Sequence, residues 1–257
     1  MHVYDYVHNA PAYANDIRGL KSFVFDAQNC VLTQRLEFEI NFKTSISFGY
    51  TDGKRYRYEG MDWSEQEKKD YIKNVTNAVT KFWSDRYKLY PSSKSCPCSR
   101  HGVSLRLALD VGRYWWSDIT LSVVKENSLY DEINNATPRA YNNFFFGVHV
   151  IRNSTIRTIN HELGHAMGLH HPGRGISKPN VPEEVRKKYP PYSFDKVGAN
   201  ELSEYAHTGK DLKGRDVHYD DLMGLGENLR PFYYDAWKNY MNDAYDTDNC
   251  QCKYEIK

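Results

Sequence analysis

The first half of the chain alternates hydrophobic and polar residues in the pattern of β-strands. Residues 22–26 and 31–50 are predicted to be strands, and the segment RLEFEINF in the second range places apolar side chains at every second position. Two further strands are predicted at 104–111 (SLRLALDV) and 118–124 (DITLSVV). The segment YNNFFFGVHVI, residues 141–151, predicts one strand or a pair of strands. We therefore expect these segments to form a sheet.

A helical period of three to four residues replaces this alternation between residues 62 and 88. The period predicts a long amphipathic helix, which Asp62 or Ser64 would cap at its N-terminus. The apolar positions of this helix are Trp63, Tyr71, Ile72, Val75, Val79, Phe82 and Trp83. Another helix is predicted to open near Ser154 or Thr155, both of which are competent N-caps.

The segment after residue 171 is predicted to begin as a loop and to end as a helix. Proline has no N–H to donate to a helix or a sheet, and five of the ten prolines of the chain lie in the first part of this segment. These five are Pro172, Pro179, Pro182, Pro190 and Pro191. The basic run at 186–188 is interpreted as a solvated edge of this loop rather than a binding patch. A helix follows near residues 230–244.

Composition and charge exclude several functions. The 257 residues carry a formal net charge of +1 with both signs spread along the chain, which gives no electrostatic footprint for binding nucleic acid. No apolar run approaches the roughly 20 residues that a membrane span needs. The first residues, MHVYDYVHNAPAYAND, lack the apolar core of a signal peptide. We expect either a cytosolic protein or a secreted chain whose signal peptide has been removed.

Residues 158–173, TINHELGHAMGLHHPG, concentrate four histidines and one glutamate. An α-helix turns about 100° per residue, so His161 and His165 project from one face, a single turn apart. Two imidazole nitrogens at that separation can hold one Zn²⁺. Glu162 directly follows the first histidine, so its carboxylate lies beside the metal. That position suits a general base acting on a metal-bound water.

A third protein ligand has to come from beyond this helix. If the helix continued, His171 would lie roughly 9 Å further along the axis than His165 and could not reach the same ion. Gly168 removes this restriction, because glycine enters the left-handed conformation without steric cost and commonly ends helices there. We therefore expect His171 to be the third ligand and His170 to point elsewhere. Pro172 prevents a return to helix.

The stretch matches the pattern HExxHxxGxxH, and the chain thereby resembles the metzincin clan of zinc metalloproteases. The resemblance implies an α+β fold with a mixed twisted sheet and long helices in an upper lobe (1–171) and the zinc helix at the cleft floor. It also implies a smaller irregular lower lobe (172–257) with a C-terminal helix, the two lobes forming one metalloprotease domain over 1–257. In this clan a strand on the upper rim of the cleft pairs with the substrate backbone. That rim would lie within 138–147, which contains Phe144, Phe145 and Phe146.

The same clan places a methionine in a tight turn beneath the zinc. Met223, which stands just before Gly224 and ahead of a predicted helix, is the candidate for this Met-turn. A methionine that fills a gap in the core would fit the same pattern. Astacin-like and serralysin-like members carry a tyrosine two residues after the methionine, where this chain has Leu225. The tyrosines nearby, none of which the sequence selects as a fifth ligand, are Tyr219, Tyr233 and Tyr234.

The resemblance implies a secreted endopeptidase that acts on a protein or peptide substrate. His161, His165 and His171 would hold Zn²⁺ and leave a fourth position for water. Glu162 would take the proton of that zinc-bound water and later return it to the leaving amine. The alternative is a catalytically inactive binding module with a zincin fold, although the intact Glu162 favours an enzyme. The whole chain also resembles the metzincin A subunit of bacterial AB5-type enterotoxins, which implies a toxin subunit with a B-subunit partner.

The five cysteines are Cys30, Cys96, Cys98, Cys250 and Cys252. Their odd number leaves one over, which in a secreted protein suggests a bridge to another chain or a free thiol. Neither C-x-C pair is expected to bond within itself, because the geometry would strain the disulfide. We expect at least one of Cys250 and Cys252 to bridge back to Cys30 or to the pair at 96 and 98. One cysteine would then remain for a partner chain.

Overall fold

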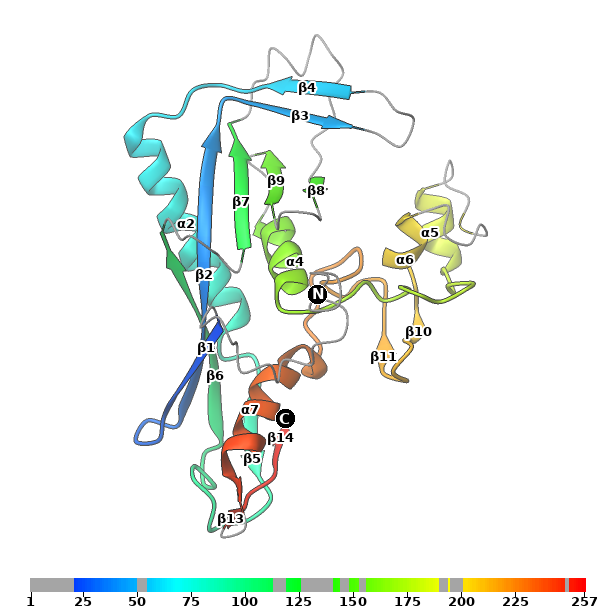
Figure 1. Ribbon diagram of the computed structural model, residues 1–257. Helices are drawn as coiled ribbons and strands as arrows, with labels where there is room; N and C mark the ends of the chain where they lie inside the picture. The colour runs from blue at the N-terminus through cyan, green and yellow to red at the C-terminus, as the bar shows by residue number, and fades with distance from the viewer. Residues whose placement is uncertain are drawn as a thin grey trace, which may run out of the picture.

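The computed structural model describes residues 21–49, 55–112, 119–125, 141–143, 148–152, 156–189, 194, 201–247 and 250–257. Within these residues the protein combines a mixed β-sheet with several helices (Figure 1). The α+β class predicted from the sequence is therefore confirmed at this level. Among the helices that the structure describes, none has the length and the apolar character to cross a bilayer.

An eight-stranded sheet forms the main layer of the described part of the chain. Its strands are β1 (Lys21–Asp26), β2 (Val31–Lys43), β5 (Lys88–Pro91), β6 (Val103–Val111), β7 (Ile119–Val124), β8 (Tyr141–Asn143), β9 (Val148–Arg152) and β14 (Tyr254–Ile256). Their order is β14-β5-β6-β2-β7-β9-β8, and β1 pairs with β2 off this path. The central strands β6, β2, β7 and β9 run parallel, whereas the other four are antiparallel to their neighbours.

The alternation that the sequence shows over 31–50 is realised in β2. Leu32, Leu36 and Phe38 are fully buried on one face of the strand. The predicted segment is not one strand, because the chain leaves the main sheet after Lys43 and continues as β3 (Ser45–Gly49), which pairs with β4 (Arg55–Glu59). The sequence of residues 141–151 predicted either one strand or a pair of strands. The structure has a pair, β8 and β9.

The predicted long helix is α2 (Glu65–Trp83). Ser64, not Asp62, caps it: the Ser64 hydroxyl accepts from the Glu67 backbone N–H at 3.3 Å, and the Glu67 carboxylate accepts from the Ser64 N–H at 2.9 Å. This reciprocal pair is a capping box, which satisfies donors that the first helical turn leaves open. The buried side chains of α2 belong to the main hydrophobic core, and they are Val75, Val79 and Trp83.

The C-terminal part of the chain returns to the same core. A 3-10 helix, η1 (Pro231–Tyr234), leads into α7 (Asp235–Tyr245), close to the helix predicted at 230–244. The Tyr234 hydroxyl donates to the backbone carbonyl of Trp83 at 2.8 Å, and the Trp237 indole donates to that of Arg106 at 3.2 Å. These bonds attach the C-terminal helix to α2 and to β6. The small hairpin of β12 (Asp246–Thr247) and β13 (Cys250–Gln251) follows, before β14 joins the sheet.

The region after residue 171 contains more regular structure than its prolines predict. Two short helices, α5 (Glu183–Lys188) and α6 (Glu201–Tyr205), and the hairpin of β10 (Gly209–Lys210) and β11 (Asp216–Val217) lie there. The basic run at 186–188 forms the last turn of α5 rather than a loop edge. The two helices contribute to a small second core of Val181, Val185, Phe194 and Ala206, against which Leu202 of α6 packs, and this burial stabilises helices too short to form alone.

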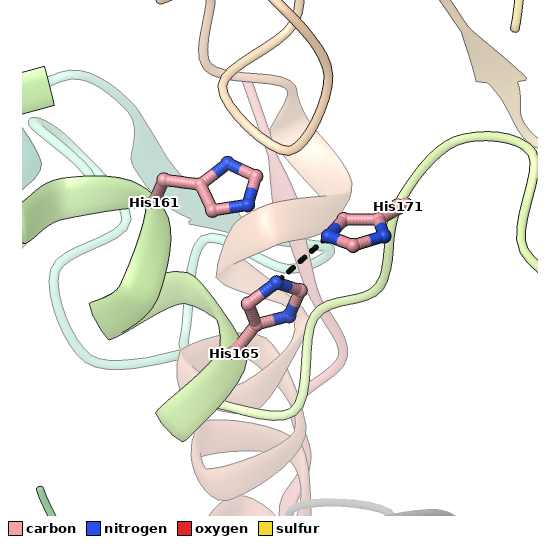
Figure 2. Close-up of side chains that lie close together, drawn as sticks. All are labelled: His161, His165 and His171. Carbon is pink, nitrogen blue, oxygen red and sulfur yellow. Dashed lines mark hydrogen bonds between the residues drawn. The ribbon is translucent and has the colours of Figure 1, made fainter. Parts of the chain in front are cut away.

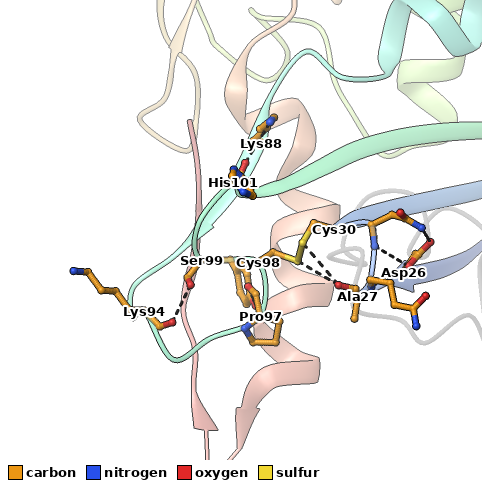
Figure 3. Close-up of a disulfide and its surroundings, with 12 residues drawn as sticks. Asp26, Ala27, Cys30, Lys88, Lys94, Pro97, Cys98, Ser99 and His101 are labelled. Atoms are coloured by element: carbon orange, nitrogen blue, oxygen red, sulfur yellow. Dashed lines mark hydrogen bonds between the residues drawn. A yellow bond between two sulfur atoms is a disulfide. The ribbon is translucent and has the colours of Figure 1, made fainter.

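Two disulfides join segments that are far apart in the sequence. Cys30 bonds Cys98 and thereby ties the turn after β1 to the loop between β5 and β6 (Figure 3). Cys96 bonds Cys252, which confirms that a C-terminal cysteine bridges back. Neither C-x-C pair bonds within itself, and Cys250 belongs to neither disulfide. Intramolecular disulfides indicate an extracellular or otherwise oxidising environment.

Three sequence predictions fall outside the described residues. They are the N-caps Ser154 and Thr155, the phenylalanines Phe144, Phe145 and Phe146, and the N-terminal stretch used to exclude a signal peptide.

Candidate metal centre

The turn predicted at Gly168 ends the histidine-bearing helix, α4 (Ile156–Ala166). Gly168 has φ +86°, in the left-handed region. Its N–H donates to the carbonyl of His165 at 2.9 Å, and the N–H of Leu169 donates to that of Gly164 at 2.9 Å. This pair of bonds is the Schellman arrangement that closes a helix C-terminus. The chain therefore reverses after Gly168 and returns His171 to the helix face.

The three histidines predicted to bind zinc lie together. The nearest ring nitrogens of His161, His165 and His171 all lie within 4.8 Å of one another. Figure 2 shows the three rings converging, two from α4 and one from the loop that follows it. Nε2 of His165 and Nε2 of His171 are 2.9 Å apart. This buried group can hold a metal ion.

Each of these imidazoles is held by an oxygen behind it, at Nδ1. His161 Nδ1 lies 2.7 Å from the carbonyl oxygen of Leu222, and His165 Nδ1 lies 2.9 Å from that of Leu169. A carbonyl oxygen only accepts, so each Nδ1 carries the proton and each Nε2 carries the lone pair. His171 Nδ1 has a different kind of acceptor, the carboxylate of Glu204 at 3.4 Å.

The arrangement fits a metal cation better than it fits a set of packed histidines. Among the described residues, the buried Nε2 of His161 has no hydrogen-bond partner. Burial, together with the proximity of His165, lowers the pKa of His161 to about 3. Burial also holds the pKa of His171 well below its ordinary value. Neutral imidazoles whose lone pairs face one point repel one another, and a cation at that point removes the repulsion.

Glu162 supplies a carboxylate beside this group. Its side chain is 8% exposed on α4, directly after His161. The negative charge of Glu162 raises the pKa of both His161 and His171, although burial of the rings outweighs it. A nearly buried carboxylate next to a metal group is placed to accept a proton from water.

The Met-turn candidate lies beneath the same helix. Met223 is fully buried, and a Cβ on Gly164 would overlap its sulfur. The helix therefore rests on the methionine only because residue 164 has no side chain. Leu222, the residue before Met223, provides the carbonyl that holds His161. The methionine thus occupies a turn that both packs under α4 and orients the first histidine.

Charged side chains fix this turn from two directions. Asp221 is fully buried and pairs with Arg230 at 2.5 Å. Burial raises the pKa of Asp221, and its hydrogen bond to Arg230 opposes that shift. Arg157 of α4 donates to the carbonyl oxygens of Gly226 and Gly224, each at 2.9 Å. The turn is consequently tied to the helix that carries the histidines.

Sequence reasoning missed two residues of the site, Glu204 and Tyr205 of α6. Glu204 accepts from His171, and its backbone carbonyl accepts from the Gly173 N–H at 2.7 Å. The Tyr205 ring lies with its centroid 3.7 Å from that of His171 and 5.5 Å from that of His161. The sequence signal is weak, because α6 lies in a segment that its prolines predict as loop.

The other residues considered at the sequence level lie elsewhere. His170 is not a member of the metal group, and its Nδ1 accepts from Arg174 at 3.0 Å. The Tyr234 hydroxyl is used in the core, as described above, and the buried Tyr233 hydroxyl accepts from the Met223 N–H at 3.4 Å. Tyr219 is directed towards Glu184, whose hydrogen bond raises its pKa. Tyr205 is the tyrosine that contacts the histidines among the described residues.

Comparisons of the chain with protein-family models, with curated proteins and with solved structures give no match.

Proposed function

We propose that this protein is a zinc-dependent endopeptidase of the metzincin type. The observation that carries the proposal is the convergence of three imidazoles, of which that of His161 is buried, beside the buried side chain of Glu162. Three imidazoles suit Zn²⁺, and three protein ligands leave a coordination position for water or substrate, which is typical of catalytic rather than structural zinc. The turn at Gly168 and the buried Met223 under α4 support the resemblance to metzincins.

Zn²⁺ held by the three histidines would act as a Lewis acid towards the carbonyl of the peptide bond and towards water. The other steps fall to residues of this chain. Glu162 takes a proton from the attacking water and delivers it to the leaving amine. The oxygens of Leu222, Leu169 and Glu204 keep the imidazoles in the tautomer that presents Nε2.

We also propose that the protein works outside the cytosol. The two disulfides support this, because the cytosol keeps cysteine thiols reduced. Cys250 lies outside both disulfides and is the cysteine that remains for a bridge to a partner chain, such as the B subunit of a toxin.

Mapping peptide cleavage tests the enzymatic proposal. The protein is stripped of metal with a chelator, reloaded with Zn²⁺, and incubated with a mixed peptide library whose products are identified by mass spectrometry. We expect internal peptide bonds to be cut by the zinc-loaded form, and no cleavage by the stripped form. A zinc-loaded protein that leaves every peptide intact would refute the proposal and favour a binding module.

A further inference from the structure

The last strand, β14, and the residues that flank it place three charged side chains on one side of the sheet. Lys253, Glu255 and Lys257 are exposed and alternate with Tyr254, which is fully buried in the main core. Successive side chains of a strand point to opposite faces. The two lysines and the glutamate therefore face away from the core together.

A lysine of the neighbouring strand lies directly opposite one of these. The N–H of Lys88 donates to the carbonyl of Lys257 at 3.0 Å, and the N–H of Lys257 donates to that of Lys88 at 2.9 Å. Residues that exchange both bonds in an antiparallel pair carry their side chains on the same face, where two like charges destabilise the sheet. Within the described part of the chain, the lysines in ion pairs are others.

The loop between β5 and β6 continues this surface. Its exposed cations are Lys94 and Arg100. The loop lies against the lysines of the two strands, because Nζ of Lys88 donates to the carbonyl of His101 at 3.2 Å and the N–H of Ser92 donates to that of Lys253 at 2.7 Å. Figure 3 shows Lys88 beside His101, with Lys94 on the same loop.

We call the five exposed cations of this surface the basic patch. They are Lys88, Lys94, Arg100, Lys253 and Lys257. Glu255 lies among them, so five cations and one anion leave a formal side-chain charge of +4. The whole chain carries +1, and the other residues therefore sum to −3. Charge that is almost balanced over the sequence is thus separated by the fold.

Two disulfides hold the loop of the basic patch in place. Cys98 bonds Cys30 of the turn after β1, and the buried Cys96 bonds the buried Cys252, next to Lys253. A fixed array of charges loses less conformational entropy on binding than a mobile one. Asp26 lies near the first disulfide (Figure 3), and subtracting its charge from +4 still leaves +3.

The surroundings of the protein narrow the class of anion. The disulfides indicate an extracellular or otherwise oxidising environment, whereas the anionic leaflet of a cell membrane faces the cytosol. The large apolar side chains exposed in the described ranges are Val24, Met61 and Leu212, and none belongs to the basic patch. The patch therefore has no apolar group to insert into a bilayer. Sulfate groups accept charge-assisted hydrogen bonds from lysine and arginine, and a sulfated glycan carries many along one chain.

We propose that the basic patch binds a sulfated glycan. A sulfate close to Lys88 and Lys257 would offset the repulsion between the two opposed ammonium groups. The sheet order places β5 and β14 at the edge opposite to β9 and β8, and α4 packs near β9 (Figure 1). The inference goes beyond the proposed function, because a glycan bound at this edge would retain the protein at a surface without occupying the metal centre.

Titration of the full chain with heparin, a densely sulfated glycan, tests the proposal. Its control is heparin from which the sulfates have been removed and which keeps its carboxylates. We expect heparin to bind at least about tenfold more tightly than the desulfated form, and its affinity to fall as the salt concentration rises. Equal affinities for the two glycans, or no binding of heparin, would overturn the proposal.

A single charge reversal separates loss of binding from loss of folding. Lys257→Glu places an anion opposite Lys88, so the midpoint of thermal unfolding is expected to stay equal or to rise. Its affinity for heparin is expected to fall at least about tenfold. The control is Lys73→Glu on the exposed side of α2, outside the patch, which is expected to bind as the wild type does. An equal loss in both variants would assign the binding to net charge and overturn the proposal.

Two other polyanions decide the class of partner. Vesicles that contain phosphatidylserine and the peptide polyglutamate are titrated under the same conditions as heparin. Weaker binding of both than of heparin would support a glycan surface. Equal or tighter binding of either would overturn the proposal and assign the patch to a membrane or to an acidic protein. Proteolysis enters none of these measurements, so their outcome is independent of the enzymatic proposal.

Discussion

The imidazole of His171 and the carboxylate of Glu204 meet at 3.4 Å across 33 residues of sequence. The contact joins the loop after α4 to α6 and gives the third histidine of the group a carboxylate as acceptor. A carboxylate behind a ligating imidazole fixes the ring and raises its basicity. Glu204 is therefore expected to position His171 for metal binding.

Glu204→Ala is expected to weaken zinc binding by about 10- to 100-fold, because such partners of ligating histidines typically contribute that much. Glu204→Gln is expected to lose less, since its amide oxygen still accepts from Nδ1. The control is Glu183→Gln on the exposed face of α5. Competition with a chromophoric chelator measures the affinities. Equal affinities in the alanine variant and the wild type would remove Glu204 from the site.

Glu162→Ala is expected to abolish proteolysis while zinc stays bound. Loss of a general base typically costs a factor of about 10² or more in rate, whereas the three imidazoles do not depend on this carboxylate for their hydrogen bonds. The measurements are kcat/KM on a cleaved peptide and zinc content by elemental analysis. Cleavage near the wild-type rate would contradict the assigned role.

The two adjacent histidines are expected to behave differently. His171→Ala removes one of three converging nitrogens and should lose zinc under mild chelation. His170→Ala should retain the metal, because that ring contacts Arg174 instead. Zinc content after dialysis against a weak chelator ranks the variants, and the reverse order would overturn the arrangement described at Gly168.

Gly164→Ala is expected to destabilise the protein by about 1–3 kcal/mol, because the new Cβ overlaps the sulfur of Met223. At an open helical position the same change stabilises by about 0.5–1 kcal/mol. The change in the free energy of unfolding caused by Gly164→Ala is therefore measured twice, in the wild type and in a Met223→Ala background. Urea unfolding should show a smaller penalty, or a gain, in the second case. Equal penalties would show that the two residues do not compete for space.

Acidification is expected to destabilise the metal-free protein below pH 6.5. Burial lowers the pKa of His161 from its ordinary value of 6.5 to about 3. Between pH 6.5 and pH 3 the unfolded chain therefore binds a proton at this residue that the native state does not bind. Under that condition the free energy of unfolding falls as the pH falls, by about 1.4 kcal/mol per pH unit for this group. Urea unfolding of chelated protein at several pH values measures the slope. His161→Gln should flatten it, and an equal slope in this variant would contradict the assignment.

Local patterns predicted much of the secondary structure and the core of the site. The helical spacing of His161 and His165 and the position of Gly168 were sufficient to place His171, because each of these effects acts within a few residues. The N-cap of α2 was likewise predicted in part, because the sequence offered both Asp62 and Ser64 and the structure has Ser64.

What the sequence did not show depends on contacts between distant segments. Glu204 and Tyr205 reach the histidines from a helix of only five residues, which exists through packing of the small second core. No local period marks such a helix, and the run of prolines that ends ten residues before it, at Pro191, suggests loop. The break between β2 and β3 was missed for a similar reason, since alternation continues through Thr44 while the pairing partner changes.

The two disulfides overlap along the chain, from 30 to 98 and from 96 to 252. Any single backbone cut between Cys30 and Cys252 therefore leaves two fragments that remain covalently joined. A nick by another protease, or by a second copy of this protein, would go unnoticed by size under non-reducing conditions. Separation of the pieces would require a reductant, so a nicked molecule stays whole until it meets a reducing environment.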